Sequence, residues 1–599
     1  MCGIFGYVGS TLPKATRGKS AAQIVFEGLK RLEYRGYDSW GITSLNQISN
    51  IRYQKLIVEK HVGKIGNSSL DSKLSTLDSN IALGHTRWAT HGGVTRENTH
   101  PHLDCSGEIA IVHNGIVENW EELKKNLSKN HKFKSQTDTE VVVHLVEEQM
   151  KGRTLKKAVR RAFLNIQGLN AFIFINKGRE IVAVKNGSPL VVGVGKNEKF
   201  IASDTAGIIP YTRDIHFVED GELVVIGDEV EIFDVKTGAS KKLKLSKIDY
   251  KKQEAKLGRF AHFMLKEINE QPRVLRNLTL NPAARTMADL VNKAFGIFFV
   301  ACGSASYAAL CGTYLFSKVC KKHVNFSIGS EFKYLEDYIH EGTLVVPISQ
   351  SGESVDVIEP VLAAKKKGAK IAALVNVEGS TLFRIAGFNF LLGAWPERAV
   401  VATKSLTAMI AALIMIAYSL VGKEKVAKEI ITSVSRDIEG ILDDYRVEKV
   451  KNLAKRLSRV KDVYVIGRGL SYATALEASL KLKEACYLHA EGFAGGELKH
   501  GVIALIEKGT PCIVFAPNDE TYDEIISNAQ EVKARGAYII GIGPLNNQVF
   551  DEFIKTGDLA EATMISQIVV SQLLAYFIAV EKGIDPDKPR NLAKSVTVK

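Results

Sequence analysis

Hydrophobic residues in the first part of the chain, up to about residue 225, form short runs typical of β-strands. Helix-like segments with a longer hydrophobic period interrupt these runs at 20–34 and 137–150. Mixed strands with a few helices predict an α+β layered domain. The predicted strands are 3–9, 80–86, 108–115, 170–177, 180–187, 199–204 and 221–228.

From about residue 275 the pattern changes to alternating strands and helices. Residues 295–319 predict an apolar strand, a Gly/Ser turn and a helix of small residues, and 460–485 repeat this order. Further apolar strands follow at 343–350 and 510–517. We therefore predict two doubly wound parallel α/β domains, at 275–430 and 450–585.

Between these halves the chain is polar and rich in lysine, which predicts a linker and connecting segment at 223–274. The 599 residues require several domains, because single cores stop growing at about 250–300 residues. The formal net charge is +13, but the excess lies in many short runs. This distribution is typical of solvated lysine faces, so no nucleic-acid partner is predicted.

The seven cysteines are scattered, odd in number and without a CxxC pair. This usage is typical of a reducing compartment and predicts a cytoplasmic protein. The histidines within 85–91 and 99–102 lack a usual metal spacing, so neither a metal nor another cofactor is predicted. No signal peptide is predicted, and the longest apolar stretch, 406–422, fits a buried helix better than a membrane span.

Cys2 stands directly before the first predicted strand. If Met1 is removed, as we expect, residue 2 carries both a thiol and an α-amine. The amine titrates near about 7.7–8.0 and so can serve as a general base for the thiol. From position alone, a small buried cysteine is the better interpretation.

Six motifs, in order along the chain, favour a catalytic role for Cys2 over a purely structural one. Together they resemble the glutaminase domain of class II glutamine amidotransferases, over residues 2–222. The resemblance implies a four-layer N-terminal-nucleophile hydrolase fold in which Cys2 attacks the side-chain amide of glutamine. It also implies an oxyanion hole formed by Asn114 and the backbone N–H of Gly115. The motifs are CGIFGYVG (2–9), LEYRGYDSWG (32–41), GHTRWATHGG (84–93), HPHLD (100–104), VHNGIVEN (112–119) and TDTEVVVH (137–144).

The same resemblance implies a binding site for the substrate glutamine. Arg87 would hold its α-carboxylate and Asp138 its α-ammonium, with Trp88, Thr90 and His91 lining the pocket. Taken singly, Arg87 could form a surface ion pair. Asp138 or Thr137 could be an ordinary N-cap of the helix that follows.

The segment SQSGESVDVIEP (349–360) follows an apolar strand and opens a helix. Hydroxyls and free N–H groups at a helix N-terminus favour an anion, although a simple capping motif of Ser351, Glu353 and Ser354 is the alternative. No GxxxxGK[ST] motif accompanies the segment, which argues against a nucleotide. The segment resembles the phosphosugar-binding loop of sugar isomerase domains. That resemblance implies sugar-phosphate binding by Ser304, Ser349, Gln350, Ser351, Ser354, Val400 and Ala593.

The second repeat lacks this serine motif and carries other candidates. With the glutaminase domain and both repeats in this order, the chain resembles amidotransferases that act on a phosphosugar. Lys481, Glu484 and His500 match catalytic positions of that family. The resemblance implies that Glu484 moves a proton between C1 and C2 of the sugar, His500 opens the ring and Lys481 stabilises enolate charge. The alternative is a lysine-rich helix face with a weak ion pair between Lys481 and Glu484.

The C-terminal tail, 586–599, is polar and without helical periodicity, so by itself it should fray. The resemblance makes it a lid, with Lys594 forming a Schiff base with the C2 ketone. Two positions near the implied sugar contacts depart from the family pattern, Ala305 and Ala402.

The resemblance covers the whole chain and implies transfer of the glutamine amide nitrogen to fructose 6-phosphate, giving glucosamine 6-phosphate and glutamate. It implies a homodimer with no membrane or nucleic-acid partner. The alternatives are a purine-pathway amidotransferase, a non-catalytic phosphosugar sensor and a deglycase. The first lacks its phosphoribosyl-binding motif here, the second usually carries a helix-turn-helix, and the third needs no glutaminase half.

Overall fold

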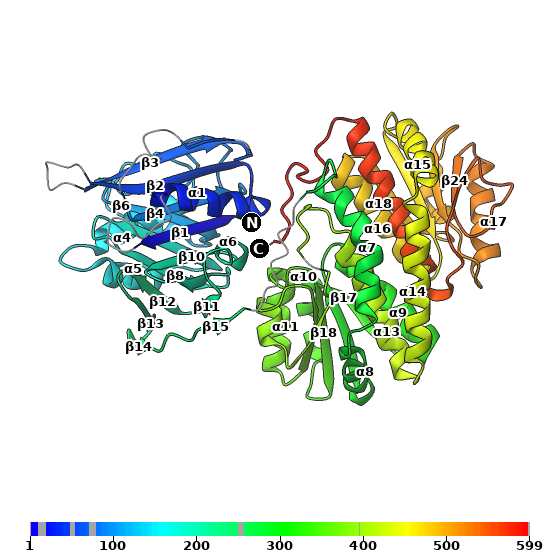
Figure 1. Cartoon of the computed structure of the whole chain (residues 1–599), viewed down its shortest axis with the longest axis horizontal. Helices are drawn as coiled ribbons and strands as arrows, with labels where there is room; N and C mark the ends of the chain where they lie inside the picture. The colour runs from blue at the N-terminus through cyan, green and yellow to red at the C-terminus, as the bar shows by residue number, and fades with distance from the viewer. Residues whose placement is uncertain are drawn as a thin grey trace. The chain divides into compact units, whose positions relative to one another are not determined.

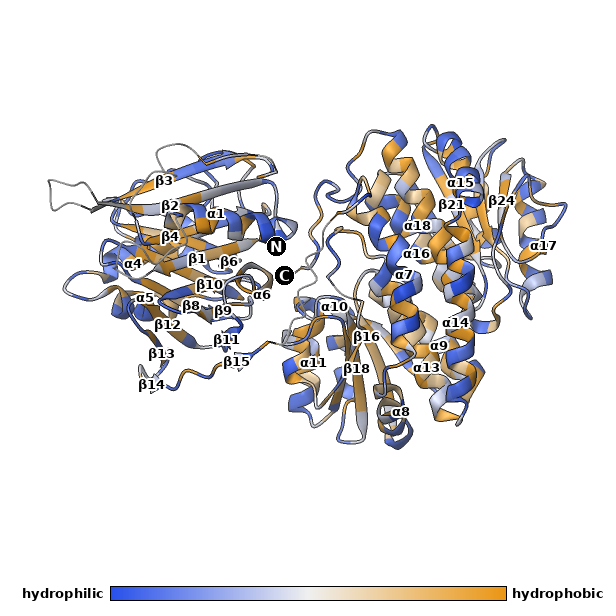
Figure 2. Ribbon diagram, in the orientation of Figure 1, coloured by the Kyte–Doolittle hydropathy of each residue, from blue (hydrophilic) through white to orange (hydrophobic). Residues whose placement is uncertain are grey.

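The computed structural model describes residues 2–9, 19–47, 54–66, 68–70, 79–248, 257–394 and 396–596. The chain forms two compact units (Figure 1). The first comprises Met1–Lys252 with Ala593–Lys599, and the second comprises Gln253–Leu592. In both, the hydrophobic positions concentrate in the strands and in the helix faces packed on them (Figure 2).

The first unit contains an eight-stranded antiparallel sheet in which β1 lies between β10 and β4. The strand order is β15-β11-β9-β10-β1-β4-β2-β3. Their bounds are β1 Gly3–Gly9, β2 Ser39–Gln47, β3 Gln54–Val62, β4 Ile81–Arg87, β9 Val191–Val194, β10 Glu198–Ala202, β11 Asp214–Phe217 and β15 Ser246–Lys247.

A second, seven-stranded antiparallel sheet has the order β14-β13-β12-β8-β7-β6-β5. Its strands are β5 His102–Leu103, β6 Ile109–Gly115, β7 Asn170–Asn176, β8 Ile181–Asn186, β12 Glu222–Ile226, β13 Val230–Asp234 and β14 Ser240–Lys241. The helices among the described residues of this unit include α1 Ala21–Leu32, α3 Trp120–Asn126, α4 Asp138–Gln149, α5 Leu155–Phe163 and α6 Thr205–Ile208.

Strand β1 shows why these elements form four layers. Ile4 and Val8 pack into a core shared with strands of the second sheet. Phe5 and Tyr7 point to the other face and pack with α1. Both faces of β1 are therefore buried, as its continuous apolar run predicts. Because α4 and α5 cover the outer face of the second sheet, the order is helix, sheet, sheet, helix. The α+β layered fold predicted for this region is confirmed.

The second unit contains two five-stranded sheets, and each is parallel throughout. The first has the order β17-β16-β18-β19-β20 and the second β22-β21-β23-β24-β25. The strands of the first are β16 Gly296–Ala301, β17 Asn325–Ile328, β18 Thr343–Ser349, β19 Lys370–Val375 and β20 Phe388–Leu391. Those of the second are β21 Asp462–Gly467, β22 His489–Ala494, β23 Pro511–Phe515, β24 Tyr538–Gly543 and β25 Glu552–Lys555.

Both sheets thus follow the order 2-1-3-4-5, one of the common doubly wound topologies, so the predicted pair of α/β domains is confirmed. Their helices share one core that contains residues of both sheets. The helices are α7 Phe263–Leu278, α8 Ala283–Lys293, α9 Ser304–Cys320, α10 Gly329–Phe332, α11 Val355–Lys366, α12 Thr381–Ile385, α13 Lys404–Leu420, α14 Glu424–Ile441, α15 Asp444–Leu457, α16 Leu470–Cys486, α17 Tyr522–Lys533 and α18 Thr563–Glu581.

The segment 223–274, predicted to be a linker, is instead divided between the two units. The strands β12–β15 continue the sheets of the first unit up to Lys247, and α7, from Phe263, belongs to the second unit. The lysine-rich composition of β14 and β15 hid these strands, because they lie at sheet edges where most of their residues are exposed.

One helical stretch in the described part of the chain, Ala560–Glu581, is long and apolar enough to cross a membrane. Within the second unit, however, 89% of its most apolar window is buried. It therefore packs as a core helix, and so does α13, which contains the long apolar stretch noted in the sequence.

Candidate active sites

Cys2 lies immediately before β1 and is held by its neighbours along the chain. The backbone N–H of Gly3 donates to Thr86 Oγ1 at 3.1 Å, and that of Ile4 donates to Ser203 Oγ at 3.0 Å. These bonds add to the pairing of β1 with β4 and β10. The start of the chain is thus fixed within a sheet, in contrast to a frayed end.

The thiol of Cys2 contacts the backbone after β4. The N–H of Trp88 donates to Cys2 Sγ at 3.3 Å. Burial raises the pKa of the Cys2 thiol, while the Trp88 N–H and the nearby Arg87 guanidinium act in the opposite direction. A nucleophilic role therefore requires a base that removes the thiol proton.

Asn114 and Gly115 end β6 beside Cys2. The Asn114 side-chain amide donates to the Cys2 carbonyl at 2.9 Å, while its buried Oδ1 has no hydrogen-bond partner among the described residues. Gly115 has φ +137°, and a Cβ there would lie 2.4 Å from the carbonyl oxygen of Leu169. Only glycine fits this backbone, which brings the amide of residue 115 to the end of the strand that carries Asn114.

Arg87 ends β4 and is buried, so the alternative of a surface ion pair is wrong. Its guanidinium donates to the carbonyls of His91, Gly92 and Gly93 at 2.5, 3.1 and 3.1 Å. It thereby folds back the loop that carries Trp88, Thr90 and His91. Trp88 and His91 are half-buried in this loop and Thr90 is exposed.

Asp138 is the first residue of α4 and is buried. Its Oδ2 accepts a hydrogen bond from the backbone N–H of Val117 at 2.8 Å. Thr137 occupies the N-cap position, but its side chain makes no capping hydrogen bond in the described structure. The capping interpretation is thus wrong for both side chains, and Asp138 instead ties α4 to the chain that leaves β6.

Four histidines near β4, β5 and β6 are buried: His85, His100, His102 and His113. His85 Nε2 lies 2.9 Å from the carbonyl oxygen of His113 and 3.2 Å from His100 Nδ1. Burial lowers the pKa of each ring, to about 3 for His85. They are therefore neutral near pH 7 and act as hydrogen-bonding groups inside the fold.

Sequence reasoning missed two side chains that position this site, although both lie in the quoted motif 32–41. Arg35 is 2% exposed, and its Nε donates to the Cys2 carbonyl at 3.3 Å while its NH1 pairs with Asp204 at 3.0 Å. Asp38 accepts from the backbone N–H of Ala89 at 2.8 Å. The motif contains both residues, but only the structure shows which atoms their side chains contact.

In the second unit, the serine-rich loop 349–354 joins β18 to α11. Ser349 Oγ accepts from the Gly352 N–H at 2.9 Å, and Ser351 Oγ accepts from the Glu353 N–H at 3.2 Å. Gly352 has φ +67°, and a Cβ there would lie 2.1 Å from Ser380 Oγ, so the turn requires glycine.

The capping alternative for this loop is not what the structure shows. Ser354 is the N-cap of α11 by position, but its side chain makes no capping hydrogen bond within the described residues. The Glu353 carboxylate accepts from the backbone N–H and the hydroxyl of Thr381, at 2.8 and 2.7 Å. Hydroxyls and N–H groups thus lie together in the loop before α11, and Gln350 in that loop is half-buried.

Ser304, the first residue of α9, meets the second α/β domain through Lys481 of α16. Lys481 Nζ donates to Ser304 Oγ at 2.9 Å and to Glu484 Oε2 at 2.6 Å, and lies 3.3 Å from Glu477 Oε1. Lys481 is fully buried, so the interpretation as an exposed lysine face is wrong. Its two carboxylate partners raise the pKa of Lys481 despite its burial.

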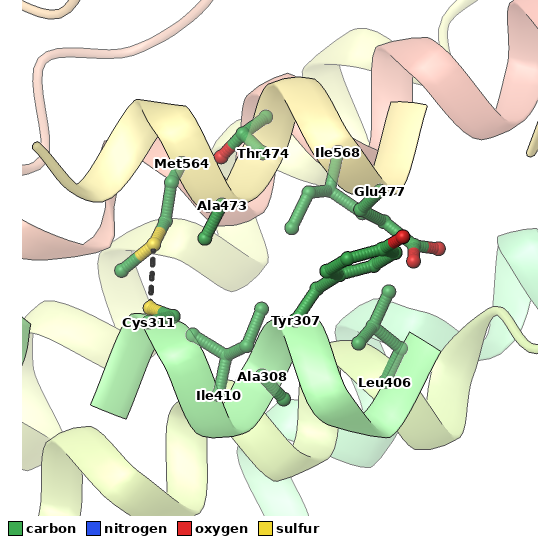
Figure 3. A pocket seen from close by; sticks show the side chains of 10 residues that line it. All are labelled: Tyr307, Ala308, Cys311, Leu406, Ile410, Ala473, Thr474, Glu477, Met564 and Ile568. Atoms are coloured by element: carbon green, nitrogen blue, oxygen red, sulfur yellow. Dashed lines mark hydrogen bonds between the residues drawn. The ribbon is translucent and has the colours of Figure 1, made fainter. Parts of the chain in front are cut away.

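Glu477 is a further group that sequence reasoning missed. It is 1% exposed, and burial raises the pKa of its carboxyl to about 7. It lines a pocket between α9, α13, α16 and α18 that is otherwise mostly apolar, with Tyr307 beside its carboxylate (Figure 3). Its only sequence signal is the i,i+4 spacing to Lys481.

The remaining candidates lie further apart along the chain. His500 ends a short 3₁₀ helix, Leu498–His500, and is exposed. The N–H of Val400 donates to the carbonyl of Asp587 at 3.0 Å, which ties the loop before α13 to the segment leading to the tail. Ala593 and Lys594 group with the first unit, so their contact with a sugar stays a prediction.

Comparison with known proteins agrees with this arrangement. Residues 45–214 match a glutamine amidotransferase domain, and residues 290–419 and 456–576 each match a SIS domain. The chain is 40% identical to a glutamine–fructose-6-phosphate aminotransferase (isomerizing) of Pyrococcus horikoshii and 41% identical to that of Caldanaerobacter subterraneus. Both matches cover 100% of both proteins.

Among solved structures, the C-terminal domain of glucosamine-fructose-6-phosphate aminotransferase from Francisella tularensis aligns with a TM-score of 0.52 and 30% identity. That match covers 56% of this chain and 100% of the other.

Fold and matches together define a glutamine amidotransferase joined to a pair of SIS domains. At this identity over the full length, the chain belongs to the glutamine–fructose-6-phosphate aminotransferase (isomerizing) family.

Proposed function

We propose that this enzyme converts fructose 6-phosphate and glutamine into glucosamine 6-phosphate and glutamate. The observation that carries the proposal is the buried contact of Lys481 with Glu484 and Ser304, which joins an acid–base pair of one SIS domain to the other domain's binding site. The arrangement of Cys2 beside Asn114 in the same chain supplies the nitrogen-releasing half.

In the glutaminase half, Cys2 Sγ attacks the side-chain carbonyl carbon of glutamine after its proton passes to a base. If Met1 is removed, the α-amine of Cys2 is that base, and the proton then goes to the departing ammonia. Donors at Asn114 Nδ2 and the Gly115 N–H stabilise the oxyanion once Asn114 turns from the Cys2 carbonyl. Water then cleaves the thioester, which yields glutamate and the free thiol.

For glutamine itself, we assign the α-carboxylate to Arg87 and the α-ammonium to Asp138. Both side chains are buried, and a guanidinium and a carboxyl group suit the carboxylate and the ammonium of the substrate, respectively. The loop of Trp88, Thr90 and His91, held by Arg87 and Asp38, would line the pocket.

In the sugar half, the phosphate would bind the hydroxyls and N–H groups of Ser349, Gln350, Ser351 and Ser354. Ser304, Val400 and Ala593 would complete that subsite. His500 would open the ring, and the Lys594 amine would attack the C2 ketone with loss of water. Ammonia would replace Lys594 at C2, and Glu484 would move a proton from C1 to C2, beside Lys481.

We further propose a cytoplasmic homodimer. His500 is exposed on the single chain although its proposed role requires contact with a substrate. A second copy would supply that site. All seven cysteines are free in the described structure, as expected in a reducing compartment.

The decisive experiment incubates purified enzyme with fructose 6-phosphate and glutamine labelled with ¹⁵N at the amide. We expect the label in glucosamine 6-phosphate by mass spectrometry. Label found only in free ammonia would overturn the transferase proposal while leaving the glutaminase intact.

The matched variants are Cys2→Ala and Cys320→Ser. Cys2→Ala should lose all use of glutamine, whereas Cys320→Ser, a half-buried cysteine of the second unit, should keep it. Full glutamine-dependent activity in Cys2→Ala would contradict the assigned nucleophile.

A further inference from the structure

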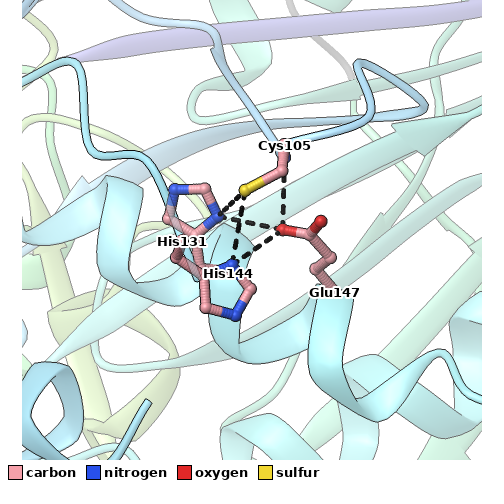
Figure 4. A group of neighbouring side chains, drawn as sticks. All are labelled: Cys105, His131, His144 and Glu147. Atoms are coloured by element: carbon pink, nitrogen blue, oxygen red, sulfur yellow. Dashed lines mark hydrogen bonds and ion pairs between the residues drawn. The ribbon is translucent and has the colours of Figure 1, made fainter. Parts of the chain in front are cut away.

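Four potential metal ligands gather in the first unit, and none of them is a residue assigned to glutamine: Cys105, His131, His144 and Glu147 (Figure 4). Cys105 follows β5, His131 lies in the segment between α3 and α4, and the other two lie one turn apart on α4. The sequence separations follow no zinc motif, which is why sequence reasoning predicted no metal.

The distances between the four donor atoms fit one small cation. Cys105 Sγ lies 3.4 Å from His131 Nδ1 and 3.6 Å from His144 Nδ1. Glu147 Oε2 lies 3.2 Å from His131 Nδ1 and 3.0 Å from His144 Nδ1. All four atoms lie within 4.8 Å of one another. In a tetrahedral zinc site, bonds of about 2.0–2.3 Å place neighbouring ligand atoms about 3.3–3.6 Å apart.

The kinds of donor point to the identity of the cation. A thiolate with two imidazoles is typical of zinc, whereas Ca²⁺ and Mg²⁺ prefer oxygen ligands throughout. We propose that Cys105, His131, His144 and Glu147 bind one Zn²⁺ ion. Binding releases the thiol proton of Cys105 to solvent and forms a sulfur–zinc bond.

The surroundings orient the proposed ligands as a metal site requires. The second nitrogen of His131, Nε2, lies 3.2 Å from Glu148 Oε1, a carboxylate–histidine contact that keeps Nδ1 turned toward the cluster. The His144 ring is 1% exposed, so packing fixes it. The backbone N–H of Cys105 donates to Glu147 Oε2 at 3.2 Å, which holds that carboxylate in place.

Four protein ligands leave no open position on a tetrahedral ion, so the proposed site is structural. It would fasten two connecting segments, the turn after β5 and the segment before α4, to the helix itself. That helix begins at Asp138, which we assign to the glutamine ammonium. Metal would thus stabilise the glutaminase unit and keep the start of α4 in position.

A metal-free hydrogen-bonded cluster is the competing explanation, and Cys105→Ser separates the two. A serine hydroxyl can keep the hydrogen bonds but is a poor zinc ligand. We expect full-length wild-type enzyme, purified without chelator, to carry one zinc ion per chain by mass spectrometry of the elements. Cys105→Ser and Glu147→Gln should each carry at least about tenfold less, while Cys320→Ser should match wild type.

A second readout uses Co²⁺ added to chelator-treated enzyme. Wild type and Cys320→Ser should show tetrahedral d–d bands and a thiolate-to-cobalt charge-transfer band, and Cys105→Ser should lack the latter. Added Zn²⁺ should raise the thermal midpoint of wild type but not of Cys105→Ser. Folded wild-type enzyme that holds no zinc and gives no thiolate band, or Cys105→Ser that behaves as wild type, overturns the site.

Discussion

The two SIS domains of this chain have the same topology but carry different chemistry. In both, the first strand leads through a glycine with positive φ, Gly303 at +57° and Gly469 at +53°, into a helix of 17 residues. Both helices end on a left-handed residue, Lys321 and Tyr487. The predicted repeat is thus accurate down to the caps of α9 and α16.

Counting from these two glycines, equivalent positions on the helices can be compared directly. Glu477 of α16 corresponds to Cys311 of α9, and Lys481 corresponds to Leu315. All four side chains are buried. One copy therefore fills its helix interface with apolar groups, while the other places an ion pair there, in contact with Ser304 of the first copy.

The loops that follow β18 and β23 also differ between the two domains, and here the first domain carries the hydroxyl groups. After β18 the first domain presents serines, with hydroxyls and N–H groups before α11. After β23 the second domain has Asp519, which binds Thr521, and α17 begins with Asp523 and Glu524. Such an acidic helix start disfavours a phosphate. The two domains thus share a fold but differ in a few side chains, which present hydroxyls in one loop and carboxylates in the other.

The largest expected effect comes from making α16 resemble α9 at its buried lysine. Lys481→Leu copies Leu315 and removes the cation between Glu477 and Glu484. We expect synthesis of glucosamine 6-phosphate to fall by about 10²–10⁴-fold, because acid–base chemistry at Glu484 loses its partner. Hydrolysis of glutamine, measured in the same preparation, should stay within about twofold, since the first unit is untouched.

Lys483→Leu is the matched control for this change, because Lys483 is exposed on the same helix. It should retain synthesis. Lys481→Met, which keeps the length of the side chain, distinguishes a packing defect from loss of charge. If Lys481→Met or Lys481→Leu retains synthesis while folded, Lys481 is only a structural ion-pair partner.

Most of the fold could be predicted from the sequence. Each strand predicted in the first 225 residues occurs in the structure, as do helices over 21–32 and 138–149. Their signals are strong because β1 and its neighbours are buried on both faces. The strands that were not predicted are β2, β3, β5, β9, β11 and β13–β15. Of these, β14 and β15 lie at sheet edges and have too few buried positions to give a hydrophobic signal.

The sequence motifs identify candidate site residues in both units, but they do not predict which residues these side chains contact. Lys481 looks like a surface lysine because the group that buries it, α9, lies far away in the chain. Arg35 reaches Cys2 across 33 residues, and Cys105 meets His144 across 39. Such contacts depend on tertiary packing, which no local spacing records.

A smaller effect is expected from giving the first domain's loop the charge of the second. Ser354→Asp keeps a good N-cap residue for α11 but places a carboxylate where we assign the phosphate. Like charges in contact cost about 3 kcal/mol here, so KM for fructose 6-phosphate should rise about 100-fold. Steady-state kinetics with saturating glutamine would measure it.

Ser354→Asn separates the effect of charge from that of side-chain size, because asparagine has nearly the same shape as aspartate and is an equally good N-cap residue. Its KM should rise by about tenfold, the lower end of the cost of losing one hydrogen bond to a charged group. Equal KM values for the Asp and Asn variants would show that no phosphate binds at this loop.

The smallest expected effect concerns the free energy of unfolding. It tests whether the buried charged groups of α16 lower stability relative to the apolar groups at the same positions of α9. Burial raises the pKa of Glu477 to about 7 from an ordinary value of 4.5. The folded state therefore binds this proton more tightly than the unfolded chain. The contribution of Glu477 to stability is complete below about pH 4.5 and is lost as the pH rises through about 7.

Glu477→Gln removes the titrating group but keeps its shape, so the variant should become more stable relative to wild type as the pH rises. The difference in unfolding free energy should change by about 2.5 kcal/mol between pH 5 and pH 8, seen as diverging thermal midpoints. Glu507→Gln, an exposed change in the same domain, should follow wild type at every pH. Parallel pH profiles for Glu477→Gln and wild type would mean that Lys481 keeps Glu477 ionised throughout. The buried ion pair of α16 would then not make the free energy of unfolding depend on pH over this range.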